Sequence, residues 1–194
     1  MAATPSNMIP LGAPAPSFAL PDTVSGRVVS LAELRSAHAT VVMFICNHCP
    51  FVKLVQDQLA QLAADYQPRG VAFAAISSND AASYPDDGPE AMKALAEMLG
   101  FTFPYLYDET QEVARAYQAA CTPDIFIYDG DLKLAYRGQL DDARPGNGRP
   151  VTGRDVRQAL DALLAGQPVN PDQRPSIGCN IKWKSAVQVP GTCT

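Results

Sequence analysis

Residues 41–52 read VVMFICNHCPFV and combine the signals that decide the fold. The first five residues are apolar and mostly β-branched, which is typical of a strand buried on both faces of a sheet. A Cys-x-x-Cys motif, Cys46 to Cys49, follows directly, and Pro50 stands where a helix would begin. The unpaired N–H groups and partial positive charge of a helix N-terminus stabilise a thiolate, the species that attacks disulfides. The stretch therefore predicts a redox dithiol between a central strand and a helix.

The flanking residues extend this unit into a strand–helix–strand crossover. Apolar residues at helical spacing predict a helix from Phe51 to Tyr66, and residues 71–76 repeat the pattern of a buried strand. Later the period changes, because residues 125–128 and 132–136 flank a turn and predict an antiparallel hairpin. The other expected elements are a small hairpin within 17–31, a helix at 89–99, an extended piece at 103–107, a helix opened by a capping pair of Asp108 and Gln111 and carrying residues 113–120, and a helix from a Thr152 cap to Gly166.

Together these segments predict a single α/β domain whose mixed central sheet is flanked by helices. Strand–helix–strand crossovers give parallel strands, and the late hairpin adds antiparallel ones. We expect a flexible Pro- and Ala-rich segment at 1–13, a folded domain at 14–166 with an N-terminal β-hairpin extension, and a Pro-rich C-terminal tail at 167–194.

Composition narrows the classes of function. The chain has 194 residues, 47% of them hydrophobic, and a net charge of -5. This charge disfavours a nucleic-acid partner, and no apolar stretch is long enough to predict a membrane span. The first 26 residues contain no Lys or Arg, so we expect no secretory signal and a cytoplasmic location. In a reducing compartment, five cysteines with two close together indicate catalysis or metal binding rather than a disulfide scaffold.

The motif CNHCPFV at 46–52, together with Thr122-Pro123 before the hairpin, resembles the thioredoxin superfamily over residues 14–166. APAPSFALPD at 13–22 and SIGCNIKW at 176–183 further resemble its redoxin branch, which holds peroxiredoxin, TlpA-type and alkyl hydroperoxide reductase/thiol-specific antioxidant-like proteins. The resemblance implies a thioredoxin-like fold and thiol–disulfide oxidoreductase activity that needs no cofactor and no metal.

The same resemblance implies roles for the motif residues. Cys46 is expected to be the nucleophile, because the first thiol should be the more exposed, and Cys49 is the resolving thiol. Thr122-Pro123 matches the superfamily's cis-proline, where the backbone of Thr122 pairs with an extended substrate peptide. His48 lies between the thiols and either favours the Cys46 thiolate, which makes the disulfide more oxidising, or is a solvated loop residue.

Three other cysteines have open roles. Cys121 directly precedes the Thr-Pro pair and is either a third redox thiol or, the interpretation we favour, an apolar filler. Cys179 either resolves a disulfide formed at the site or packs down with the tail, which we favour. Cys193, next to the terminus, is assigned no role. The polar loop at 77–88 either lines the site or is only solvated.

Departures from the family pattern limit these expectations. The buried Asp of thioredoxin, six residues before the first Cys, is matched by Thr40, so the sequence identifies no proton acceptor. Peroxiredoxins carry Thr or Ser three residues before the peroxidatic Cys. Met43 stands at that spacing before Cys46, and Cys46 stands there before Cys49, so neither supplies the hydroxyl. Arg137, at a strand end, is expected to be exposed.

The leading prediction is therefore disulfide exchange by the Cys46/Cys49 pair. Its partner would be a protein disulfide or dithiol, or a low-molecular-weight thiol, and an upstream reductase would restore the dithiol. A thiol-dependent peroxidase is the alternative. A metal carrier with Cys46, Cys49 and His48 or Cys121 as ligands is a lesser alternative, because zinc and copper accept thiolate and imidazole.

Overall fold

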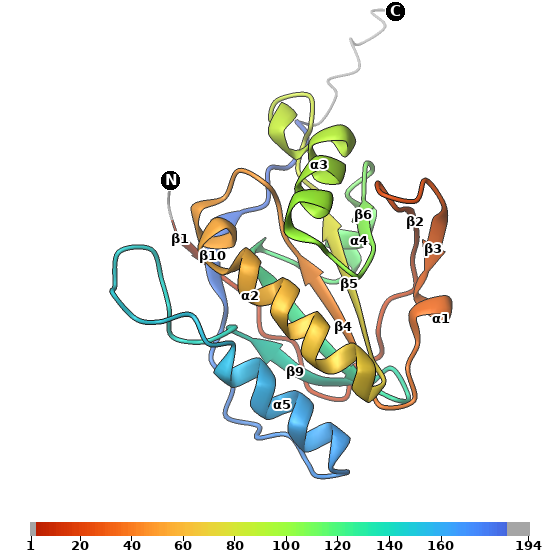
Figure 1. Cartoon of the computed structure of the whole chain (residues 1–194), viewed down its shortest axis with the longest axis vertical. Coiled ribbons are helices and arrows are strands. Elements are labelled where there is room, and N and C mark those ends of the chain that lie inside the picture. Colours follow the sequence, from red (N-terminus) through yellow and green to blue (C-terminus); the bar gives the residue numbers. More distant parts are fainter. Residues whose placement is uncertain (1–2, 186–194) are drawn as a thin grey trace, which may run out of the picture.

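The computed structural model describes residues 3–185 and is built on a five-stranded mixed sheet. The strand order is β6 (Tyr105–Tyr107), β5 (Val71–Ser77), β4 (Ala39–Phe44), β8 (Asp124–Asp129) and β9 (Leu134–Gly138). The central strand β4 pairs parallel with β5 and antiparallel with β8 (Figure 1). The predicted crossover and late hairpin are both confirmed.

β4 is buried over its whole length, which explains its continuous apolar sequence. Val41 and Met43 belong to the core cluster on one face of the sheet, and Val42 and Phe44 belong to the cluster on the other face. The strand ends at Phe44, so the chain leaves the sheet two residues before the first thiol.

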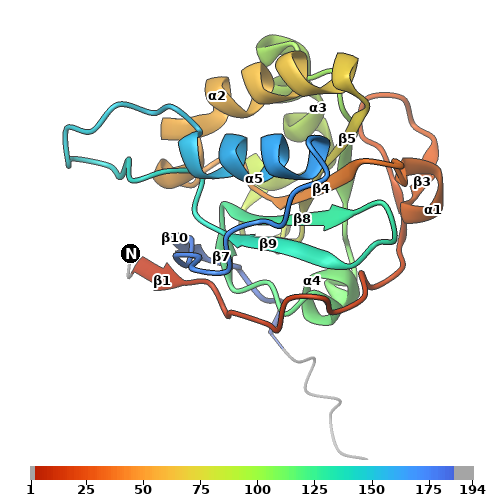
Figure 2. The same cartoon turned by 90° about the horizontal axis from the view of Figure 1, so that it is seen from below.

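Helices cover both faces of the sheet. Figure 2 shows the first group, which consists of α2 (Pro50–Tyr66), α3 (Pro89–Leu99) and α5 (Arg154–Leu164), on one side of the strands. The short α4 (Glu112–Ala116) lies on the other side, and α1 (Leu31–Leu34) packs into the same core cluster as α4. Among residues 3–185, no helix is both long and apolar enough to span a membrane.

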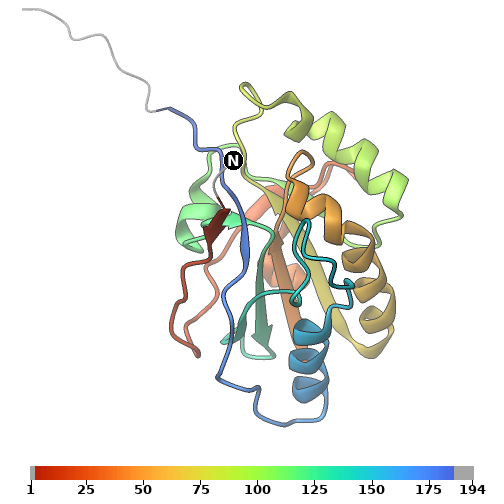
Figure 3. The same cartoon turned by 90° about the vertical axis from the view of Figure 1, so that its left-hand side faces the viewer.

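The N-terminal hairpin is confirmed as β2 (Ala19–Pro21) paired with β3 (Val28–Ser30). A second sheet, absent from the sequence-based expectation, joins the two ends of the chain. It consists of β1 (Ala3–Pro5), β10 (Ile177–Asn180) and β7 (Cys121–Thr122), with β10 in the middle (Figure 3). The expectation of a flexible segment at 1–13 is therefore wrong for residues 3–5, because their backbone groups pair with the tail.

The helix after Asp108 is shorter than expected. The carboxylate of Asp108 accepts from the backbone N–H groups of Val113 and Ala114, so it does cap the helix start. Gln111, however, lies in the left-handed region with φ 63° and does not take part in a capping pair. The helix then ends at Ala116, because Gln118 has φ 51°. The last helix also differs: its N-cap residue is Gly153, not Thr152.

Arg137 is fully buried, which corrects the expectation that it is exposed. Its guanidinium donates to Asp124 (3.1 Å), to the Ser6 hydroxyl (3.1 Å) and to the Gln118 carbonyl (2.8 Å). It also lies 4.4 Å from the centre of the Phe126 ring. Burial raises the pKa of Asp124, and the nearby guanidinium opposes that rise. This ion pair links β8 to β9, and Ser6, directly after β1, is hydrogen-bonded to both of its side chains.

Candidate functional site

The two motif cysteines lie at the carboxyl end of β4, where α2 begins. Cys49 is the N-cap residue of α2, and Pro50 occupies the first helical position as the sequence predicts. Both side chains are buried, with exposed fractions of 1% for Cys46 and 0% for Cys49. The two thiols are almost equally buried, so exposure does not distinguish Cys46 as the more exposed of the pair, which the sequence predicts.

Thr122 contacts both sulfur atoms. Its hydroxyl lies 3.3 Å from the Sγ of Cys46, and its carbonyl oxygen accepts from the Sγ of Cys49 at 3.2 Å. The peptide bond to Pro123 is cis, as expected. The sequence thus correctly placed Thr122 beside the dithiol, and the structure adds that its side chain as well as its backbone reaches the sulfurs.

The local electrostatics favour negative charge on Cys49 rather than on Cys46. A hydrogen bond from the Cys46 thiol lowers the pKa of Cys49 to about 4, with further donation from the Cys179 thiol and the Val52 backbone N–H. Holding this proton raises the pKa of Cys46, and burial and the nearby Asp87 carboxylate act in the same direction. The pKa shifts of this coupled pair, rather than its hydrogen bonds to Thr122, favour the thiolate on the second cysteine, whereas the sequence predicts Cys46 as the nucleophile.

His48 is bound to a buried carboxylate. Its Nδ1 lies 2.5 Å from Oδ2 of Asp87, and its ring stacks on Tyr84 with a centroid distance of 5.1 Å. Oδ1 of Asp87 accepts from the backbone N–H groups of Asn47 and His48, and Oδ2 also accepts from the Asn79 amide. The 77–88 loop therefore lines the site and holds the two-residue spacer, and His48 is not a freely solvated side chain.

Asp87 is a site residue that the sequence did not single out, although it lay in a loop left open above. Its exposed fraction is 0%, whereas the adjacent Asp86 is exposed. No local motif separates these two acids, because only the fold around η2 (Pro85–Asp87) turns one of them inward. Tyr105 was missed for the same reason: it is buried, and its hydroxyl donates to the Asn47 side chain (3.0 Å).

An Asp87→Asn substitution is expected to loosen the spacer and to lower the pKa of Cys46. An amide cannot accept from all four donors, so we expect a loss of about 1–3 kcal/mol in unfolding free energy. It also removes a negative charge that raises the Cys46 pKa. Urea unfolding and the pH dependence of Cys46 alkylation in a Cys49→Ser background measure the two effects. Asp86→Asn is the matched control, and equal effects of both substitutions would contradict this role for Asp87.

One group of possible metal ligands lies within the described residues. The sulfur of Cys46, a ring nitrogen of His48 and a carboxylate oxygen of Asp87 all lie within 4.8 Å of one another. This set differs from the one suggested by the sequence, because it contains Asp87 and neither Cys49 nor Cys121. In the structure Nδ1 of His48 is engaged by Asp87 and the Cys46 sulfur by Cys49 and Thr122, so the group is organised as a hydrogen-bonded network.

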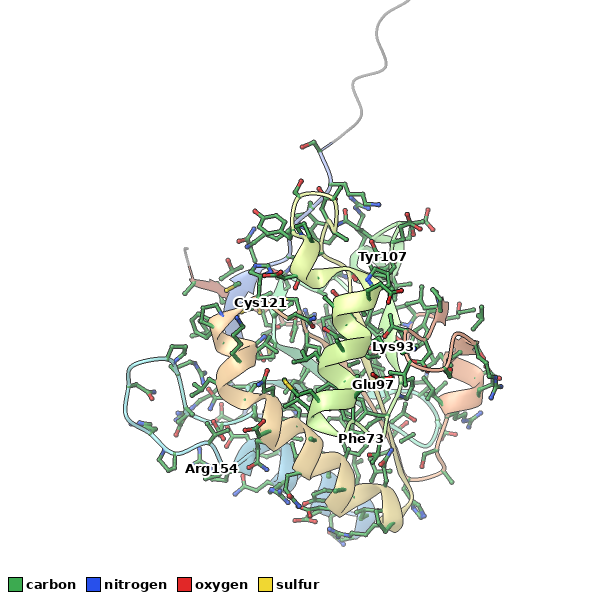
Figure 4. All side chains as sticks on the ribbon, turned by 45° about the horizontal axis from the view of Figure 1, so that its top comes forward. Phe73, Lys93, Glu97, Tyr107, Cys121 and Arg154 are labelled. Carbon is green, nitrogen blue, oxygen red and sulfur yellow. The ribbon has the colours of Figure 1, made fainter. Side chains whose placement is uncertain are left out.

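The tail brings Cys179 to the dithiol and leaves Cys121 aside. The Cys179 thiol, with an exposed fraction of 2%, lies in the same buried cluster as Cys46 and Cys49, and its proximity contributes to the lowered pKa of Cys49. Cys121, labelled in Figure 4, lies next to β10 on β7, but its thiol points to the Pro123 carbonyl at 3.6 Å. Cys121 thus fits the favoured role of an apolar filler. Cys193 lies outside the described residues.

Comparisons with known proteins identify the family. A family model described as the AhpC/TSA family matches residues 11–137. The thiol-disulfide oxidoreductase ResA of Geobacillus thermodenitrificans is 24% identical over 163 residues, covering 82% of each chain.

Two solved structures extend the likeness. An uncharacterized conserved protein from Geobacillus kaustophilus is 64% identical with a TM-score of 0.95, covering 96% of this chain and 98% of the other. A putative thiol:disulfide interchange protein DsbE from Chlorobium tepidum is 22% identical with a TM-score of 0.63, covering 81% of this chain and 99% of the other, and supports the thioredoxin-like fold alone.

Proposed function

Because the chain belongs to the AhpC/TSA family, we propose that it is a thiol–disulfide oxidoreductase whose dithiol, Cys46 and Cys49, exchanges disulfides with a protein or a low-molecular-weight thiol partner. The observation that carries this proposal is the position of the two thiols at the N-terminus of α2, where both sulfurs contact Thr122 before the cis-proline. The lowered pKa of Cys49 supports it. A sulfur that is ionised at neutral pH and has a protonated thiol beside it meets both needs of exchange, a nucleophile and a resolving group.

The proposed reaction has two steps. The Cys49 thiolate attacks a disulfide of the partner, one partner sulfur leaves as a thiolate, and a mixed disulfide forms. Cys46 then loses its proton to the leaving sulfur and attacks Cys49, which releases the second partner thiol and closes the Cys46–Cys49 disulfide. An upstream reductase restores the dithiol by the reverse exchange. His48 and Asp87 act as positioning residues, because they hold the spacer and neither is hydrogen-bonded to a sulfur of the dithiol.

Glutathione disulfide is the probe that tests this function. The reduced wild type should release two molecules of glutathione per chain and form one intramolecular disulfide, which dithiothreitol reverses. A Cys46→Ser/Cys179→Ser variant should retain one glutathione on Cys49, because no thiol remains in contact to displace it. If a Cys49→Ser variant retains glutathione on Cys46 at the wild-type rate instead, Cys46 is the attacking thiol. If the wild type releases no glutathione, disulfide exchange is excluded.

The reduced protein is expected to carry a thiolate at mildly acid pH. Its absorbance at 240 nm, which reports thiolate, should titrate near the lowered pKa of Cys49, about 4. Because this folded pKa lies below the unfolded one, Cys49 contributes stability at high pH that is lost as the pH falls through about 4. Cys49→Ser should remove the titration, while Cys121→Ser should retain it. A first midpoint near 8.5, the ordinary cysteine value, would contradict the assignment.

Reduction of a small peroxide is a second candidate. Its support is the burial of both thiols, since a peroxide needs far less room than a protein disulfide. The Cys49 thiolate would attack one oxygen of the peroxide, the O–O bond would break, and the other oxygen would leave and take up a proton to become water or an alcohol. The resulting sulfenic acid on Cys49 would condense with the Cys46 thiol, which releases water and forms the disulfide. Stoichiometric consumption of hydrogen peroxide by the reduced protein, faster than by free cysteine at the same pH, tests this activity.

A further inference from the structure

The tail strand β10 occupies the backbone edge next to the cis-proline. Cys179 is the register partner of Thr122, and Asn180 is the partner of Cys121, in an antiparallel pairing. This is the edge at which an extended substrate peptide was expected to bind. In the structure the chain's own residues hold it, so an incoming peptide must first displace β10.

The fit between β10 and this edge is close. A Cβ built on Gly178 would lie 2.0 Å from the carbonyl oxygen of Thr122, so no other residue fits without a shift of the strand. The backbone of Gly178 is not in the left-handed region that favours glycine. Glycine is therefore required at this position because there is no space for a side chain. Ser176, before the strand, is buried and donates to the Gly138 carbonyl (2.7 Å). After the strand, the Lys182 backbone N–H donates to the side chain of Asn79 (2.8 Å).

The register of β10 places the Cys179 thiol beside the Cys46/Cys49 dithiol. Cys179 belongs to the same buried cluster as Cys46 and Cys49, and it pairs in register with Thr122, whose carbonyl accepts from Cys49. The pKa values of Cys179 and Cys49 shift in opposite directions because the two thiols interact. Cys49 therefore has two thiol neighbours, one from the motif and one from the tail. Burial, followed by the interaction with Cys49, raises the pKa of Cys179 to about 12, so Cys179 stays protonated beside the Cys49 thiolate.

We propose that Cys179 is a third redox thiol of the site, which competes with Cys46 for a disulfide bond to Cys49, so that β10 acts as an internal partner strand. This proposal rests on the exchange function proposed above and adds a partner that the chain itself supplies. The burial of Cys179 agrees with the favoured sequence-based interpretation, in which it packs with the tail, and the proposal adds a redox role to that packing.

The exchange step is balanced without an outside oxidant. Starting from the Cys46–Cys49 disulfide, Cys179 loses its proton and attacks the sulfur of Cys49. The Cys49–Cys179 bond forms, the Cys46–Cys49 bond breaks, and Cys46 leaves as a thiolate that takes up the proton. The total number of disulfides is unchanged. In the oxidised protein Cys49 is in a disulfide and carries no negative charge that would oppose ionisation of Cys179. The Cys179 thiolate, which is the attacking species, therefore forms more easily than in the reduced protein.

Disulfide mapping tests the proposal. Reduced protein carrying Cys193→Ser is treated with glutathione disulfide, quenched in acid, alkylated and analysed by mass spectrometry. We expect both Cys46–Cys49 and Cys49–Cys179 peptides. In a Cys46→Ser variant the Cys49–Cys179 bond should exceed the glutathione adduct on Cys49 by about 10-fold or more, because a contacting thiol reacts intramolecularly. Cys121→Ser, a buried thiol on the neighbouring strand, is the matched control and should leave the pattern unchanged.

The outcomes separate this inference from the proposed function. If the wild type forms Cys46–Cys49 while Cys46→Ser keeps glutathione on Cys49, the exchange function stands and the role of Cys179 is wrong. A parallel oxidation with diamide, which needs no exchange with a partner disulfide, covers the opposite case. If the diamide sample contains the Cys49–Cys179 disulfide while the protein does not react with glutathione disulfide, Cys179 is a redox thiol and the proposed exchange function is rejected.

Gly178→Val is expected to lift β10 from the dithiol, because the new side chain collides with the Thr122 carbonyl. Alkylation of Cys49 by iodoacetamide should become at least about 10-fold faster, since opening of the strand is no longer needed. The Cys49–Cys179 peptide should disappear from the oxidised sample. Ile177→Val, on the same strand at a half-exposed position, is the control. An unchanged alkylation rate in Gly178→Val would show that β10 does not control access.

Discussion

A Cys49→Ser substitution is expected to reduce catalysed disulfide exchange by about a thousand-fold or more, to the uncatalysed background, as removal of an enzyme nucleophile does. The serine hydroxyl stays protonated where the thiol has a pKa lowered to about 4. Cys49 is also the sulfur that contacts both other thiols, so its loss removes the nucleophile and the acceptor of both resolving groups. Dithiothreitol-driven reduction of a peptide disulfide, followed by thiol release, measures the loss.

Two further variants, Cys121→Ser and Cys46→Ser, are compared with Cys49→Ser in the same assay. Cys121→Ser should retain wild-type turnover, because that thiol contacts the Pro123 carbonyl and not the dithiol. Cys46→Ser should slow turnover while still reacting once with a disulfide through Cys49. Residual turnover in Cys49→Ser above that of Cys46→Ser would return the nucleophilic role to Cys46, as the sequence alone suggested.

Arg137→Met is expected to produce the largest loss of stability, about 3–5 kcal/mol in unfolding free energy, because it leaves a buried carboxylate without its partner. The guanidinium and the Asp124 carboxylate are both fully buried. Met roughly matches the apolar stem of arginine but supplies none of its three hydrogen-bonding contacts. Urea unfolding at pH 7.5 measures the effect.

The pH dependence of this loss identifies its cause. Burial already raises the pKa of Asp124, and removal of the guanidinium raises it further above the unfolded value. The penalty is therefore present above the unfolded pKa and shrinks as the pH falls and the folded protein takes up a proton. Arg35→Met, which breaks an exposed pair with Asp131, is the control and should cost about 1 kcal/mol or less. A loss for Arg137→Met that is equal at pH 5 and pH 7.5 would contradict the role of Asp124.

The sequence predicted the parts of the fold that depend on local patterns. The apolar run before Cys46 gave a buried central strand, and helical spacing gave α2 and α3 close to their observed bounds. The pairing of β1 with β10 was missed, because three- and four-residue strands have no periodicity of their own and their partners lie more than 170 residues apart. The short α4 was overestimated since a left-handed residue at each end cannot be read from residue type.

The sequence predicted which residues form the site, but not how the pKa values of its thiols are shifted. Cys46, Cys49, His48 and Thr122 do converge, as the motif and the Thr-Pro pair indicated. The tail, whose course no local signal gives, packs Cys179 into the same buried cluster as both thiols. The interaction of Cys46 with Cys49, burial and the inward-turned Asp87 raise the pKa of Cys46, and the last two depend on tertiary contacts.

The position of Cys179 also bears on the lifetime of the folded chain. A Cys46–Cys49 bond closes a ring of only a few residues and barely restricts the unfolded chain. A Cys49–Cys179 bond would close a ring of more than a hundred residues, and the chain-entropy estimate for such a ring is about 4–5 kcal/mol of added stability. The choice between two disulfides that share one sulfur would then decide how often the chain opens globally, and hence its exposure to proteases, without any change in the number of oxidised cysteines.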